Sequence, residues 1–173
     1  RKVEIANATN EDWEDLATDQ SGTIYIGDFG NNSNKRKDLA IYSVQKPLHS
    51  NETSLEAVKT TFYYEDQENF PPKKRDRNFD VEAFIFMNEH FYLFTRNRSA
   101  KFDGTTKLYR LPARAGNFEA KLIDSYQTCE DNDDCMITSA DYDPVTGKLA
   151  LLSYNKVWLF SEFENDAFFN GKI

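Results

Sequence analysis

Asp12-Trp13-Glu14-Asp15-Leu16-Ala17, followed after a polar turn by Gly22-Thr23-Ile24-Tyr25-Ile26-Gly27-Asp28, is a pattern that organises the whole chain. The same order returns at Asp80–Phe86 with His90–Thr95, and again at Thr138–Asp143 with Gly147–Ser153. Apolar and polar residues alternate in these stretches, which is the period-two pattern of a β-strand. Self-similarity at a spacing of tens of residues is typical of repeat architectures. The sequence therefore predicts a strand–turn–strand unit that recurs along the chain.

Each predicted hairpin is followed by further strand patterns. They lie at 39–44 and 58–64 in the first unit, at 107–111 and 120–126 in the second, and at 156–160 in the third. Four antiparallel strands per unit describe the blades of a β-propeller. We therefore predict one all-β domain over 1–173, a partial propeller of about three four-stranded antiparallel blades at approximately 12–66, 79–127 and 137–173, with residues 1–8 a strand of a preceding blade. The alternative is a β-sandwich whose strand pairs resemble one another by accident.

The predicted number of blades is too small for a closed ring, because propellers generally have four to eight blades. An open ring exposes unpaired strand edges and the apolar faces of its end blades. We therefore expect either that the chain is part of a longer protein or that a second copy, in a homodimer, completes the ring.

Charge and composition exclude some classes of function. The net charge is −8, from 21 basic and 29 acidic residues, and an acidic surface repels phosphate backbones, so we expect no nucleic-acid partner. No apolar run has the length needed to span a bilayer. The chain opens at Arg1 without Met and without a hydrophobic signal region, which indicates a mature product or a cut piece.

Cys129 and Cys135 bracket a polar stretch, Glu130-Asp131-Asn132-Asp133-Asp134. This spacing can close a disulfide around a turn, and such a bond indicates an oxidising compartment. Two free thiols in a cytosolic protein are the alternative. No further Cys or His lies nearby to make a metal site of the pair. The predicted disulfide fixes a loop and does not hold the fold.

Carboxylates recur at one end of the predicted hairpins. Glu14 and Glu82 occupy matching places in the first strand, and the antiparallel second strand returns Asp28 to the side of Glu14 and Thr95-Arg96 to the side of Glu82. Asp12 and Asp80 precede the two glutamates, and the third unit offers Thr138 and Ser153 at the equivalent places. These residues are therefore expected at the mouth of one central channel.

Three interpretations of these acids stay open. Glu14, Asp28 and Glu82 could hold Ca²⁺, which prefers oxygen ligands. Carboxylates with divided pKa values could act as acid and base. The third interpretation is structural: the acids accept hydrogen bonds from backbone N–H groups, or pair with Arg96 and Arg98. The two histidines, His49 and His90, have no Ser or Cys motif near them that indicates a triad.

A resemblance rests on Asn10–Ala17, Tyr25–Asn32, Asn78–Phe84, Leu93–Arg96 and Ile137–Tyr142. In these motifs, and over nearly its whole length, the chain resembles a family of secreted β-propeller proteins that are frequent in Bacteroidetes and mostly of unknown function. The resemblance implies an exported location, and further blades on both sides of this region. It supplies no catalytic residues. A more distant likeness to phytase- or esterase-like propellers rests on the acidic first strands.

The sequence as a whole predicts an exported binding or scaffold module. Its ligand surface is the channel rim of Asp12, Asp80, Arg96, Thr138 and Ser153, and its ligand is an unknown small molecule, glycan or protein. The alternative is a Ca²⁺-dependent hydrolase of phosphate or carboxylic esters that uses Glu14, Asp28 and Glu82.

Overall fold

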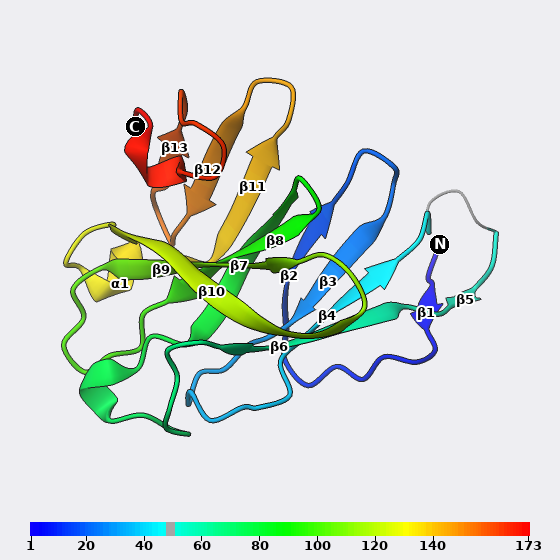
Figure 1. Ribbon diagram of the computed structural model, residues 1–173, viewed down its shortest axis with the longest axis horizontal. Coiled ribbons are helices and arrows are strands. Elements are labelled where there is room, and N and C mark those ends of the chain that lie inside the picture. The colour runs from blue at the N-terminus through cyan, green and yellow to red at the C-terminus, as the bar shows by residue number, and fades with distance from the viewer. Residues whose placement is uncertain (48–50) are drawn as a thin grey trace.

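The regular secondary structure of the chain is almost entirely β-strand in a computed structural model that describes residues 1–47 and 51–173, with the backbone alone at 132 and 133 (Figure 1). The helical elements are single short turns: η1 (Lys74–Asp76), α1 (Asn132–Cys135) and η2 (Phe168–Asn170). The prediction of an all-β fold is confirmed.

Three repeated units make up most of the structure. The first unit contains β2 (Trp13–Thr18), β3 (Ile24–Asp28), β4 (Ala40–Val44) and β6 (Val58–Tyr64). The second contains β7 (Asp80–Met87), β8 (His90–Arg96), β9 (Thr105–Pro112) and β10 (Gly116–Gln127). The third contains β11 (Ser139–Asp143), β12 (Lys148–Leu152) and β13 (Val157–Phe160). Within each unit, neighbouring strands pair antiparallel and follow one another in chain order.

The first two units share one sheet, which the sequence did not predict. The N-terminal part of β10 pairs with β6 in parallel, while its C-terminal part pairs with β9. The result is an eight-stranded sheet in the order β2-β3-β4-β6-β10-β9-β8-β7. The two end strands of this sheet, β2 and β7, lie side by side, so the sheet nearly closes on itself. β11, the first strand of the third unit, lies against β7.

The three first hairpins have the same register. Leu16 lies opposite Ile26 in the first unit, Phe84 opposite Leu93 in the second, and Ala140 opposite Leu151 in the third. Each pair follows from the alternation of apolar and polar residues, because a slip of one residue would move every side chain to the other face of the sheet. The repeat that is visible in the sequence is therefore also a repeat of strand pairing.

Apolar side chains from neighbouring units form the cores between them. One cluster joins the first and second units and contains the rings of Tyr25, Phe29, Phe84 and Phe91. Tyr25 meets Phe91 edge to face, with 5.0 Å between the ring centroids. A second cluster joins the second and third units. The units thus pack face to face in a row.

The N-terminal segment supplies a short strand, β1 (Glu4–Ile5), which pairs in parallel with β5 (Ser54–Leu55). Asn7 fastens this segment further, because its side chain donates to the backbone oxygen of Ala57 and accepts from the backbone N–H of Ala57. The pair lies beside the first unit (Figure 1). The assignment of residues 1–8 to a preceding blade stays a prediction.

The predicted disulfide is present between Cys129 and Cys135, whose Cα atoms are 5.6 Å apart. It closes the loop between β10 and β11, and the backbone of this loop also bonds to Gly104 through Thr128. By the chain-entropy estimate, so short a loop gains only about 2 kcal/mol from closure. Within the described residues, no helix is long and apolar enough to cross a bilayer.

Candidate functional site

β-Bulges open the first strands of the first two units at the predicted glutamates. Pairing between β2 and β3 shifts between Trp13 and Leu16, the interval that contains Glu14. Pairing between β7 and β8 shifts between Val81 and Ala83, the interval that contains Glu82. A bulge redirects a side chain out of the regular ladder and is common next to functional sites. The two glutamates therefore occupy matched and locally irregular positions.

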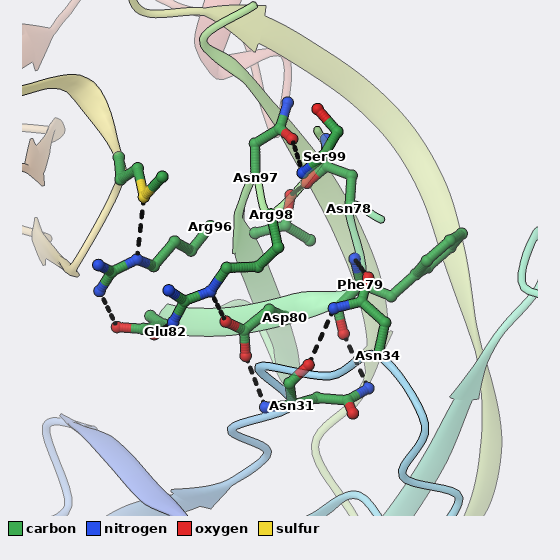
Figure 2. A network of polar contacts seen from close by, with 12 residues as sticks. Asn31, Asn34, Asn78, Phe79, Asp80, Glu82, Arg96, Asn97, Arg98 and Ser99 are labelled. Carbon is green, nitrogen blue, oxygen red and sulfur yellow. Dashed lines mark hydrogen bonds and ion pairs between the residues drawn. The ribbon is translucent and has the colours of Figure 1, made fainter. Parts of the chain in front are cut away.

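Glu82 lies at the centre of an ion-pair network (Figure 2). Its two carboxylate oxygens accept from Arg96 Nη1 at 2.9 Å and from Arg98 Nη2 at 2.7 Å. Arg98 also donates from Nε to Asp80 Oδ2 at 2.6 Å, so one guanidinium joins two carboxylates. Such charge-assisted pairs fix both partners in orientation.

The loop after β3 reaches this network from the first unit. The backbone N–H of Asn31 donates to Asp80 Oδ1 at 2.5 Å. The Asn31 side chain donates to the backbone oxygen of Phe79, and Asn34 Oδ1 accepts from the backbone N–H of Phe79. Asn34 adopts a left-handed backbone conformation with φ of 54°, which asparagine tolerates better than most residues. Two buried amides thus fasten this loop to the start of β7.

The matching region of the first unit is built differently. Asp28 accepts from Arg36 Nη2 at 3.1 Å and from the backbone N–H of Asp12 at 3.0 Å. Glu14 and Asp12 lie over Gly30, where an added Cβ atom would stand 2.3 Å from Glu14 Oε1. A side chain at position 30 would therefore displace the Glu14 and Asp12 carboxylates from these positions. No hydrogen bond or ion pair joins the Glu14 carboxylate to another residue of the described chain.

The name "carboxylate cluster" is used below for five acids and the three arginines among them. The acids are Asp12, Glu14, Asp28, Asp80 and Glu82, and the arginines are Arg36, Arg96 and Arg98. With five carboxylates against three guanidinium groups, ionised acids leave the cluster net negative.

Burial and mutual repulsion raise two pKa values in the carboxylate cluster. Burial, and then the charges of Glu82, Asp12 and Asp80, raise the pKa of Glu14 to about 7. Burial also raises the pKa of Asp80 to about 6, although its contacts with Arg98 act in the opposite direction. Glu14 therefore changes its charge near neutral pH.

The third unit joins the network through residues that the sequence did not indicate. Arg96 donates from Nε to Met136 Sδ at 3.3 Å, and from Nη2 to the hydroxyl of Tyr154, whose ring centroid lies 5.2 Å from the guanidinium carbon. The predicted rim residues Thr138 and Ser153 bond to the backbone of β12 and of the loop before β11 instead. Thr138 donates to the backbone oxygen of Leu152, and the Ser153 hydroxyl donates to that of Asp134.

The positions of the remaining candidates are also defined. His90 lies at the turn between β7 and β8, with Nδ1 2.8 Å from the backbone oxygen of Asn88, at the end of the hairpin away from Glu82. His49 lies outside the described residues. The glycine- and asparagine-rich stretch 30–34 is a local signal for a loop, but nothing in the sequence links it to Asp80. Nothing local marks Arg36, Met136 or Tyr154 as partners either.

Two of the three predicted calcium ligands, Asp28 and Glu82, are engaged by arginines in this arrangement. Asp28 Oδ1 and both carboxylate oxygens of Glu82 accept from arginines, which compete with a cation for the same lone pairs. In the part of the chain that the structure describes, no group of three or more His, Cys, Asp or Glu side chains is placed to hold a metal ion. The contacts match the structural interpretation of the acids more closely, and the calcium site stays a prediction.

The raised pKa of Glu14 predicts a pH-dependent stability. Between its ordinary value of 4.5 and about 7, the folded protein keeps a proton that the unfolded chain has lost. Stability should therefore be greatest below pH 5 with respect to this group, and fall as the pH rises through 7, by about 1 kcal/mol after allowance for solvent screening. Urea denaturation at pH 5, 6, 7 and 8 measures this fall. Glu14→Gln should flatten the profile above pH 6, and parallel profiles for the two proteins would contradict the assignment.

The chain matches no protein-family model, and a comparison with curated proteins finds no relative.

Proposed function

We propose that the chain is an exported binding or scaffold module of the β-propeller type, in which the three units are blades and the carboxylate cluster lies at the mouth of the central channel. The common register of the first hairpins and the face-to-face packing of the units support this proposal. So does the adjacency of the first strands, since β2 and β11 both lie against β7.

The ligand that we propose carries a positive charge. This proposal rests on a difference between the matched residues Glu14 and Glu82. Glu82 has Arg96 and Arg98 as partners, whereas the residues at the corresponding places after β3 are Phe29 and Asn31, so Glu14 lacks both arginines. A primary amine or guanidinium would supply the missing charge and hydrogen bonds. A small molecule, an amino sugar of a glycan or a basic side chain of a protein all offer such a group.

The proposal of export rests on the disulfide, because such bonds persist in oxidising compartments. The net charge of −8 argues against nucleic acid as the partner. The resemblance to secreted propeller proteins also supports export. It further supports the proposal that a second copy or further chain segments complete the ring.

A Ca²⁺-dependent hydrolase of phosphate or carboxylic esters is the second candidate. The observation that favours it is Glu14, because a carboxyl with a pKa of about 7 suits acid–base chemistry at neutral pH. The ion pairs of Asp28 and Glu82 favour the binding module.

Calorimetric titration distinguishes the two candidates. Two probes are used separately, N-acetyl-arginine amide and CaCl₂, on the wild type, on Glu14→Gln and on Glu11→Gln, a matched change at an exposed neighbour. We expect the arginine derivative to bind the wild type and Glu11→Gln alike, and Glu14→Gln to weaken it about tenfold, the loss of one charge-assisted hydrogen bond. Calcium binding that Glu14→Gln abolishes would favour the hydrolase. If neither probe binds the wild type, the proposed ligand class is wrong.

A further inference from the structure

The third unit has apolar side chains on both faces. Leu149, Leu151 and Phe160 are fully buried against the second unit. On the opposite face of the same strands, Leu152, Val157 and Leu159 are 44%, 56% and 55% exposed. An antiparallel sheet with one face in water normally carries polar residues there. A second apolar face indicates a surface that something covers.

Strand pairing makes this second face continuous. Leu152 lies opposite Val157, and Ala150 lies opposite Leu159. Side chains directly opposite each other on antiparallel strands are in contact range. The name "third-unit face" is used below for these four residues.

An apolar groove lies on the outer side of the first unit. It has a volume of about 860 Å³, and Leu16 on its wall is 61% exposed. The name "first-unit groove" is used below for this groove, whose apolar lining is Val3, Ile5, Trp13, Leu16, Ile24, Ile26, Val44 and Pro47.

The two internal junctions show which face packs on which. In the second strands, Ile24, Phe91 and Leu149 are equivalent by register, and so are Ile26, Leu93 and Leu151. Phe91 and Leu93 pack against the first unit, and Leu149 and Leu151 pack against the second unit. By the same equivalence, a unit that preceded the first one would pack against Ile24 and Ile26. Both side chains line the first-unit groove.

The same equivalence assigns the third-unit face. Ala150 and Leu152 correspond to Tyr92 and Phe94, which pack against the third unit. Ala150 and Leu152 therefore lie on the face of the third unit that would pack against a following unit. The third-unit face and the first-unit groove are the two halves of the junction that the protein already makes twice.

We propose that a second copy of this chain docks head to tail, with the third-unit face of one copy seated in the first-unit groove of the other. The proposal rests on the propeller arrangement proposed above. If each copy uses both surfaces, two copies close a ring of six units, within the four to eight blades of propellers. Glu14 also lines the groove, so the partner would complete one wall of the carboxylate cluster.

Mass measurement tests the docking. Sedimentation velocity of the 173-residue chain at tens of micromolar should give about twice its 20.1 kDa. Leu159→Lys, in the third-unit face, and Leu16→Lys, in the groove, should each give a monomer with the wild-type circular dichroism spectrum. Val145→Lys is the matched control, because Val145 is 88% exposed in the turn between β11 and β12, outside both surfaces, and it should leave the dimer intact.

Mixing the two disruptive variants tests the head-to-tail geometry. Leu159→Lys keeps an intact groove and Leu16→Lys keeps an intact third-unit face, so an equimolar mixture retains one good junction and should again form dimers. A wild-type monomer at these concentrations, or a dimer that both lysines leave unchanged, would overturn the proposal. A dimer that is lost in both variants but not regained on mixing would overturn the head-to-tail arrangement. None of these outcomes depends on whether Glu14 binds a cation, so the two proposals fail separately.

Discussion

Asp80→Asn should lower the free energy of unfolding by about 3–5 kcal/mol, the range for breaking one partner out of a buried ion pair. Asp80 is fully buried, and both of its oxygens accept hydrogen bonds, one from Arg98 Nε and one from the backbone N–H of Asn31. Asparagine has the same shape but only one carbonyl oxygen. Its NH₂ group must then face one of two donors, which leaves that donor without an acceptor and destabilises the folded state.

The pH dependence of this loss identifies its cause. Burial raises the pKa of Asp80 to about 6, so the wild-type carboxyl is ionised at pH 8 and largely protonated at pH 5. At pH 5 the folded protein keeps a proton on Asp80 that the unfolded chain has lost, so the wild type loses stability as the pH rises to 8. Asparagine does not titrate, so the difference between wild type and Asp80→Asn should be smaller at pH 8 than at pH 5, measured by urea denaturation at both. Asp141→Asn is the control, because Asp141 is exposed and, among the described residues, its side chain bonds only to the backbone N–H of Tyr142, and it should change stability by less than about 0.5 kcal/mol.

A second substitution separates the ion pair from the backbone contact. Removing both charges of a buried pair is usually far less costly than removing one. Arg98 also pairs with Glu82, so Arg98→Met is costly by itself, but it should cost less when placed on Asp80→Asn than on the wild type. The double-mutant cycle gives the coupling between Asp80 and Arg98. A purely additive result would show that the contact with Asn31 carries the effect.

Strand positions could be predicted from this sequence because they depend on local patterns. The alternation in Ile24–Asp28 and in Leu149–Leu152 fixes which side chains face the core, and the hairpin turns then fix the register. The matched positions of Glu14 and Glu82 followed from the same alignment. The junction of β6 with β10 could not be predicted, because either outer strand has the same pattern whether or not a neighbour pairs with it.

The partners of the acids were harder to predict for a similar reason. Glu82 and Arg96 share one hairpin, so their proximity follows from strand pairing. Tyr154 reaches Arg96 across 58 positions of chain, and no local signal links them. The difference between the first and second units was nevertheless present in the sequence. Phe29 and Asn31 stand where the second unit has Arg96 and Arg98, and the register of the two hairpins gives that comparison its meaning.

Phe84→Ala should cost about 3–5 kcal/mol of unfolding free energy, the usual range for truncating a fully buried aromatic ring. Phe84 belongs to β7, and its ring packs edge to face against Phe29 of the first unit at 5.2 Å and also contacts Phe91 at 5.9 Å. The cavity left by alanine would open between the first and second units. Because both units belong to one hydrogen-bonded sheet, their strands cannot move together to fill it. Tyr63→Ala, at a ring that is 47% exposed on β6, is the control and should cost much less.

The shape of the Phe84→Ala unfolding curve carries a second result. The first and second units share both a sheet and a core, so removing a ring between them should shift the urea midpoint while leaving a single transition with an unchanged slope. Two resolved transitions, or a clearly smaller slope, would mean that the first unit unfolds separately once this contact is weakened. The face-to-face packing of units would then be too weak to order the carboxylate cluster, because Asp80 and the loop at Asn31 come from opposite sides of that junction.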